Sequence, residues 1–343
     1  MILELDSPLD SAGKPTRLET AAELFEPRDL ADGGLETSTT DNAVQFQNVY
    51  CKISGENILS GITLDIRRGE IMGILGRNGA GKTTLLSLIS GLREYASGRV
   101  VVLGERLPSR KAEFRRRIGF VLQEDALYQE LTLAENLKFA ASLYGVQNPE
   151  KRIREVLKIL GLSDRPNQVV RTLSGGLRRR AAIARAFLHD PELFVIDEPT
   201  LGVDADARHA VWAYLRLLRS KKRTVIVATN YLDEALALCD RVAVLEEGWM
   251  LGVERPRDLV RRTGSCIDIE CDEATARRIV SGFTNAGQVI RADLTLSGVS
   301  LFLNKGASSD EVLRELTHYG EVEGYRLRAP DLSEVFKSFG LRL

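Results

Sequence analysis

The sequence predicts an α/β protein with a parallel-sheet core, an inserted helical subdomain and a small α+β domain toward its C-terminal end. The first observation is a glycine-rich loop over residues 76–84, placed between an apolar strand-like segment and an apolar helical pattern. The second is another apolar run, residues 193–197, that ends in carboxylates. The third is helical periodicity over residues 124–170, between two regions in which strand and helix patterns alternate.

The first strand–loop–helix segment predicts a phosphate site. The loop fits the pattern G-x-x-x-x-G-K-[ST], in which glycines let successive backbone N–H groups point at one anion. Lys82 is expected to reach the β- and γ-phosphates, and the Thr83 hydroxyl is expected to ligate Mg²⁺. The sequence therefore predicts a nucleoside triphosphate site formed by Gly76, Arg77, Asn78, Gly79, Ala80, Gly81, Lys82, Thr83 and Thr84.

Two carboxylates follow the second apolar run. Residues 193–197 have the composition of a buried parallel strand, and the carboxyl ends of such strands form the edge at which α/β sheets bind ligands. Asp197 is then positioned to hold Mg²⁺, directly or through water. Glu198, one residue further, is the candidate general base that polarises the attacking water.

A third segment, residues 173–177, also has the composition of an anion site. Ser174, Gly175 and Gly176 stand at the start of a helical pattern, where backbone N–H groups and the helix dipole favour negative charge. One chain does not need two such sites for one γ-phosphate. Two chains packed head to tail do need them, because each chain then closes the nucleotide site of the other.

In their order along the chain, the phosphate loop, Gln123, residues 173–177 and the strand ending in Asp197 resemble the nucleotide-binding subunit of an ATP-binding cassette transporter. The resemblance covers about residues 44–256 and implies a P-loop NTPase cassette. It implies a two-fold dimer, expected to be a homodimer, with two ATP molecules between each phosphate loop and the opposing Ser174–Gly176 segment. It also implies that Gln123 senses Mg²⁺ and water, and that Asp204 lies at the dimer seam.

Two positions depart from the family pattern. The family usually has a histidine after the strand that is residues 224–229 here, whereas this chain has Asn230 and carries its histidines elsewhere. An asparagine can donate a hydrogen bond to phosphate but cannot carry a charge, and because Glu198 is retained we expect hydrolysis, at a reduced rate. Family members often place an aromatic ring over adenine where this chain has Ile53, so stacking worth about 1–3 kcal/mol is weakened.

Composition limits the expected partners. A formal net charge of −1 gives no argument for nucleic acid, and the short basic clusters 115–117, 178–180 and 221–223 are expected on solvated helix faces. The four cysteines have no metal-binding spacing and are expected to be reduced. No apolar run approaches the ~18 residues of a membrane helix. The resemblance therefore implies a separate multi-spanning permease, with this chain bound peripherally at the cytoplasmic face of the cell membrane.

The regions outside the phosphate motifs have distinct compositions. Residues 1–43 contain ten acidic and three basic residues, which predicts an acidic, largely disordered extension. Within the helical subdomain, Thr132–Glu135 fits a capping box that opens a helix. By resemblance this subdomain forms the groove for a permease helix, and the apolar candidates on that surface are Tyr128, Leu131 and Leu133.

Residues 257–343 predict the small α+β domain. Strand patterns cover residues 266–270 and 299–303, and helical patterns cover 274–283 and 309–319. The ending, residues 329–336, resembles the C-terminal tail of cassette subunits from drug, antibiotic and lipid exporters. We therefore expect an ATPase subunit that powers an exporter. Two alternatives stay open: a soluble cassette ATPase that acts on ribosomes or DNA, and a nucleotide sensor with little turnover.

Overall fold

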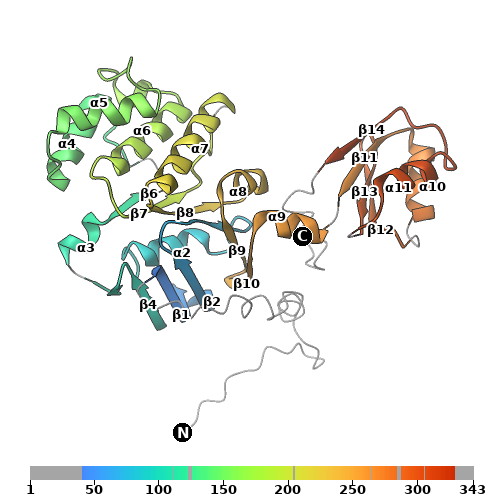
Figure 1. Ribbon diagram of the computed structural model, residues 1–343, viewed down its shortest axis with the longest axis horizontal. Helices are drawn as coiled ribbons and strands as arrows, with labels where there is room; N and C mark the ends of the chain where they lie inside the picture. Colours follow the sequence, from blue (N-terminus) through green and yellow to red (C-terminus); the bar gives the residue numbers. More distant parts are fainter. Residues whose placement is uncertain are drawn as a thin grey trace, which may run out of the picture. The chain divides into compact units, whose positions relative to one another are not determined.

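The computed structural model describes residues 41–109, 111–122, 126–203, 205–263, 265–283, 287–304 and 306–328 (Figure 1). The chain divides at residue 253 into two compact units, and each is described by itself. Several sequence predictions fall outside the described residues. These are the extension up to residue 40, Gln123, Asp204 and the exporter-like ending 329–336.

A six-stranded sheet forms the centre of the first unit, in the order β10-β9-β3-β8-β7-β6. The pairs β3/β8, β3/β9, β7/β8 and β6/β7 are parallel, which confirms the predicted α/β class. Every residue of β3, β7 and β8 is buried, because helices or a second sheet cover both faces. The strands are β3 (Ile71–Leu75), β6 (Ile118–Val121), β7 (Leu193–Asp197), β8 (Thr224–Thr229), β9 (Arg241–Glu246) and β10 (Trp249–Glu254).

A second, antiparallel sheet lies on one side of the central sheet, in the order β2-β1-β4-β5. Helix α2 lies between the two sheets, and its leucines pack into one apolar cluster with both (Figure 1). This packing holds the start of α2, and with it the phosphate loop, at the carboxyl end of β3. The elements are β1 (Asn42–Ile53), β2 (Glu56–Arg67), α2 (Lys82–Ile89), β4 (Ser97–Val102) and β5 (Glu105–Arg106).

Helices cover the other face of the central sheet and form a second apolar cluster with it. The predicted capping box is confirmed: the Thr132 side chain accepts from the Glu135 backbone N–H, and the Glu135 carboxylate accepts from that of Thr132. These helices are α4 (Leu133–Tyr144), α5 (Pro149–Ile159), the 3₁₀ turn Val170–Thr172, α6 (Gly175–Phe187), α7 (Ala205–Ser220) and α8 (Leu232–Leu238). Helix α3 (Ala112–Arg116), before β6, packs instead through Phe114 into the first cluster.

One surface prediction in the helical subdomain is wrong. Leu133 is fully buried, because it begins the face of α4 that continues through Leu137 and Ala140 into the core. Tyr128 is 54% exposed, as expected, but its apolar neighbours on the surface are Phe139 and Leu143, which are 50% and 65% exposed. The rings of Tyr128 and Phe139 meet edge to face, with 5.3 Å between their centroids.

The second unit contains helix α9 (Pro256–Thr263) and a four-stranded antiparallel sheet in the order β12-β13-β11-β14. After α9, its chain order is βαββαβ, the split βαβ arrangement of ferredoxin-like folds. The predicted strands and helices are confirmed, whereas β12 and β14 were not predicted. The elements are β11 (Cys266–Glu270), α10 (Glu273–Phe283), β12 (Val289–Thr295), β13 (Gly298–Leu303), α11 (Ser309–Leu316) and β14 (Gly324–Arg328).

Two kinds of feature are absent from the described residues. Within them, no helix is both long and apolar enough to cross a membrane. The same residues contain no cluster of three or more His, Cys, Asp or Glu side chains suited to a metal ion. Within the described part of the chain, none of the four cysteines forms a disulfide.

Candidate functional site

The phosphate loop depends on glycine at two positions. A Cβ at Gly76 would overlap the carbonyl oxygen of Leu245 at the end of β9. Gly81 has φ +102°, and a Cβ there would lie 2.8 Å from the Leu59 side chain. Both positions therefore exclude larger residues, the first by close approach of a neighbouring strand and the second also by its backbone conformation.

Lys82 is buried under the loop with 5% of its surface exposed. Its ammonium donates hydrogen bonds to the carbonyl oxygens of Gly76 (2.8 Å) and Arg77 (3.0 Å). Burial lowers the pKa of Lys82, while the carboxylates of Glu198 and Asp197 act in the opposite direction. The backbone carbonyl groups of the loop thus hold the Lys82 ammonium in place. It lies near Asp197, the last residue of β7, and Glu198, which follows it.

Asp197 joins the loop to the central sheet. The Thr83 hydroxyl donates a 2.6 Å hydrogen bond to the Asp197 carboxylate, across 114 residues of sequence. Burial raises the pKa of Asp197, and the hydrogen bond from Thr83 opposes that shift. A hydroxyl and a carboxylate, both on rigid elements and side by side, are hard oxygen donors that suit Mg²⁺. The two residues therefore fit the magnesium role predicted for them.

Glu198 follows Asp197 in a left-handed backbone conformation with φ +49°. Its backbone N–H donates to the carbonyl oxygen of Ala228 on β8 (2.8 Å), so the neighbouring strand fixes this turn. Non-glycine residues rarely adopt positive φ, and such residues concentrate at functional sites. Burial raises the pKa of Glu198, which makes its carboxylate a stronger base than an exposed glutamate.

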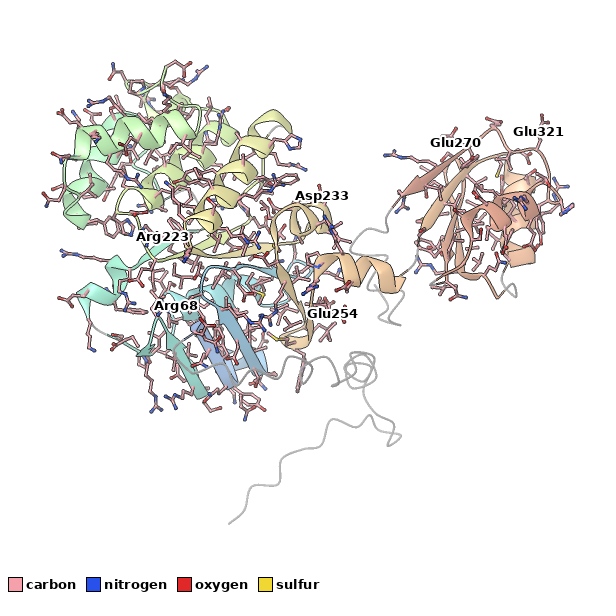
Figure 2. All side chains as sticks on the ribbon, in the orientation of Figure 1. Arg68, Arg223, Asp233, Glu254, Glu270 and Glu321 are labelled. Carbon is pink, nitrogen blue, oxygen red and sulfur yellow. The ribbon has the colours of Figure 1, made fainter. Side chains whose placement is uncertain are left out.

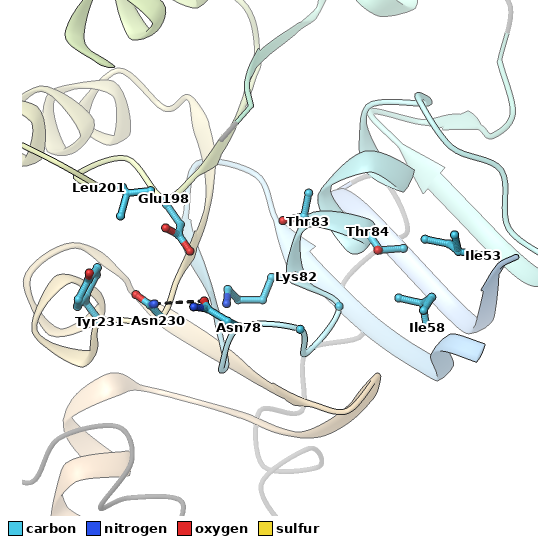
Figure 3. A pocket seen from close by; sticks show the side chains of 12 residues that line it. Ile53, Ile58, Asn78, Lys82, Thr83, Thr84, Glu198, Leu201, Asn230 and Tyr231 are labelled. Atoms are coloured by element: carbon cyan, nitrogen blue, oxygen red, sulfur yellow. Dashed lines mark hydrogen bonds between the residues drawn. The ribbon is translucent and has the colours of Figure 1, made fainter. Parts of the chain in front are cut away.

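Asn230 comes directly after β8 and faces the same loop. Its side-chain amide donates to the Asn78 side-chain oxygen at 3.4 Å (Figure 3). The Asn230 side-chain oxygen is buried and has no hydrogen-bond partner among the residues that the structure describes. The residue at the usual histidine position is therefore an uncharged amide in direct reach of the phosphate loop.

These groups surround a pocket of about 570 Å³, a volume within the range of small-molecule sites. Ile53 and Ile58 lie at one end of it, and Glu198 and Asn230 lie at the other (Figure 3). Ile58, Leu201 and Tyr231 were not predicted, since no motif marks them. The lining consists of Ile53, Ile58, Asn78, Gly79, Gly81, Lys82, Thr83, Thr84, Glu198, Leu201, Asn230 and Tyr231.

The second predicted anion segment does not line this pocket. Ser174 caps α6, its hydroxyl accepting from the Leu177 backbone N–H at 3.3 Å. Ser174 and Gly175 are exposed, and Gly176 is buried. The N-terminus of α6 is therefore exposed and lies outside the pocket of the chain's own phosphate loop.

Arg179 is a site residue that the sequence reasoning placed wrongly. It was expected with its neighbours on a solvated helix face, but it is 3% exposed. Its guanidinium donates to the backbone carbonyl oxygens of Leu122 and Asp197. Arg179 thus ties the helix that Ser174 caps to the end of β7, where the candidate Mg²⁺ ligand Asp197 and the candidate base Glu198 lie.

Comparison with known proteins supports the family that the sequence motifs resemble. A family model described as ABC transporter matches residues 59–201, which span β2 to the turn after Glu198. The linearmycin resistance ATP-binding protein of Bacillus subtilis is 34% identical, over 85% of this chain and 96% of that protein. The chain belongs to the ATP-binding cassette (ABC) transporter family. The cassette is thus an ATP-binding subunit with ATPase activity.

Two further relatives extend the comparison. The Nod factor export ATP-binding protein I of Burkholderia lata is 34% identical to this chain, over 85% of this chain and 95% of that protein. A solved ATP-binding cassette, described as dimeric in a post-hydrolysis state with ADP and phosphate, is 30% identical with a TM-score of 0.58. It covers 62% of this chain and 99% of its own. None of these relatives supports a ribosome- or DNA-directed ATPase, or a sensor with little turnover.

Proposed function

We propose that two copies of the cassette enclose two ATP molecules, each between the phosphate loop of one copy and the Ser174–Gly176 segment of the other. The observation that carries this proposal is the separation of the two anion sites. The pocket contains Lys82 and Glu198, whereas Ser174 lies exposed at a helix N-terminus outside it. A solved relative that is described as dimeric and bound to ADP and phosphate supports a dimer.

Within each site the residues divide the work of ATP hydrolysis. Lys82 and the loop N–H groups bind the β- and γ-phosphates, and Asn230 donates a hydrogen bond to the γ-phosphate. Glu198 accepts a proton from a water molecule whose oxygen attacks the γ-phosphorus, as the bond to the bridging oxygen of ADP breaks. Mg²⁺, when bound, would neutralise charge on the phosphates, and Thr83, Asp197 and Gln123 would hold it.

The apolar end of the pocket is the proposed adenine site. Ile53 and Ile58, at the adjoining ends of β1 and β2, give it two aliphatic side chains. They can cover a base face without the stacking that an aromatic ring provides. We therefore expect the chain to discriminate weakly between adenine and guanine, and the triphosphate to supply most of the binding affinity.

The proposed partner is a separate multi-spanning permease, which would hold the cassette at the cytoplasmic face of the cell membrane; nucleic acid is not a partner. Tyr128, Phe139 and Leu143 form an exposed apolar patch on the helical subdomain that suits a permease helix. Relatives named for linearmycin resistance and for Nod factor export support an exporter. The cargo would be recognised by the permease.

The dimer can be tested in the slow-hydrolysis background Glu198→Gln. With Mg-ATP this variant is expected to elute as a dimer on size exclusion. Adding Ser174→Arg should abolish the dimer but leave ATP affinity of the monomer unchanged, because Ser174 does not line its own pocket. A persisting dimer, or a loss of monomer ATP affinity, would contradict the composite site. Adding Lys151→Glu, on the exposed face of α5, is the matched control.

A further inference from the structure

Basic residues that are far apart in the sequence meet at one edge of the central sheet. The parallel strands β6, β7, β8 and β3 start in register there, so the segments that precede them lie side by side. The Gly69 backbone N–H donates to the Thr224 hydroxyl (3.0 Å), and a Cβ on Gly69 would touch the Lys222 backbone. Arg68 and Arg223 lie on this side of the first unit (Figure 2). This is the edge opposite the carboxyl ends that hold the phosphate loop.

Four carboxylates at this edge already have arginine partners. The pairs are Glu70 with Arg241 (3.2 Å), Asp190 with Arg223 (2.5 Å), Glu192 with Arg117 (2.6 Å) and Asp240 with Arg219 (2.5 Å). The same segments carry five further basic residues that are exposed and make no ion pair within the described part of the chain. We call these five the basic edge: Arg67, Arg115, Arg116, Lys221 and Lys222. Three exposed acids, Asp41, Asp65 and Glu113, accompany them. Arg68 shares the Glu192 carboxylate with Arg117 (3.5 Å), so the edge keeps a surplus of three positive charges.

A segment of opposite charge joins the fold at the same place. The Arg68 backbone N–H donates to the carbonyl oxygen of Asp41 (2.9 Å), just before β1 begins at Asn42. Residues 1–40 precede this point and contain nine acidic and three basic residues. Four neighbouring strands about 4.8 Å apart are roughly 15 Å across. An extended residue spans up to about 3.5 Å, so about five residues of this segment cross the strands that carry the basic edge.

We propose that the acidic segment 1–40 docks on the basic edge of its own chain. Its attachment beside Arg68 gives it an effective concentration on the order of millimolar at that edge, which favours it over a free polyanion. The surplus of positive charge supplies the attraction, and several weak charge pairs act together. Because docking uses the amino ends of the strands, it leaves the nucleotide edge free.

Zero-length carbodiimide cross-linking of the full chain tests this docking. The reagent joins a carboxylate to a lysine amine only when they are in contact, and Lys221 and Lys222 supply the amines at the basic edge. Cross-links from residues 1–40 to these lysines are expected in 20 mM salt. They should fall at least about fivefold in 1 M salt, where the screening length is near 3 Å. Without the cross-linker, the rate of ATP hydrolysis should stay the same when the acidic side chains of residues 1–40 are neutralised by substitution.

A triple variant and a matched control make the result decisive. Reversing three charges (R67E, R115E, R116E) keeps both lysines and should reduce the cross-links at least about fivefold. Reversing three exposed charges on α5 (K151E, R154E, K158E) should leave them unchanged. Isotope-labelled mixtures separate links within a chain from links between chains. The proposal is overturned by absent cross-links, by links only between chains, or by binding of phosphatidylglycerol vesicles or DNA at this edge in place of the segment.

Discussion

Asn230 offers the most specific test of how this cassette handles the γ-phosphate. Its amide donates one long hydrogen bond to Asn78 (3.4 Å), and a contact this weak lets the amide turn toward a phosphate oxygen. Replacing it by alanine removes one hydrogen bond from an uncharged donor to the charged γ-phosphate, worth about 1.5–3 kcal/mol. The expected loss is therefore about 13- to 160-fold in the rate of ATP hydrolysis.

The assay is steady-state phosphate release by the purified cassette with saturating Mg-ATP, between pH 6 and pH 9. The pocket has no histidine in its lining, so the wild-type profile in this range should lack an imidazole limb. Asn230→His should be active and should add a limb near an imidazole pKa of about 6.5. A collapse of activity by several orders of magnitude in Asn230→Ala would refute the reasoning, because it would make Asn230 indispensable.

Three further predictions follow from the geometry. Lys82→Ala should weaken ATP binding by about 2–5 kcal/mol in titration calorimetry, because it removes a buried cation from the phosphates; unchanged affinity would exclude the loop as the site. Glu198→Gln should melt at a higher temperature than the wild type at pH 8 without nucleotide. Burial raises the folded-state pKa of Glu198, so its stabilising contribution is present at low pH and is lost as pH rises through that pKa. The difference in melting temperature should therefore shrink toward about pH 4, and a constant difference would rule out this cause. Phe139→Ser should reduce co-purification with the permease while ATPase activity of the isolated cassette is kept, and Lys138→Ser, beside it on α4, is the control.

The phosphate site was predictable because its chemistry is local. Nine adjacent residues set the loop, and the apolar segments on both sides indicate the strand and helix that hold it. Arg179 was not predictable by the same means. Its partners are the carbonyl oxygens of Leu122 and Asp197, 57 and 18 residues away, so only the folded chain shows why an arginine is buried there.

Strands β12 and β14 were missed for a related reason. Charged residues interrupt their apolar pattern, and the sheet satisfies those charges across strands. Arg328 on β14 pairs with Asp268 on β11 (2.6 Å), and the Arg291 guanidinium on β12 lies 3.9 Å from the centre of the Phe302 ring on β13. Leu133 was misplaced because one residue alone does not show which face of a helix points into the core. The buried positions that follow it on α4, Leu137 and Ala140, show that Leu133 lies on the buried face.

The central claim is that this pocket hydrolyses ATP with Glu198 as the base. The most direct measurement is single-turnover hydrolysis of Mg-ATP by the wild type and by Glu198→Gln, with ATP binding measured in parallel. We expect equal binding and a rate that is lower by about 10²–10⁴-fold in the variant. Equal rates would mean that water is activated elsewhere, and a wild type that binds ATP without hydrolysing it would contradict the account.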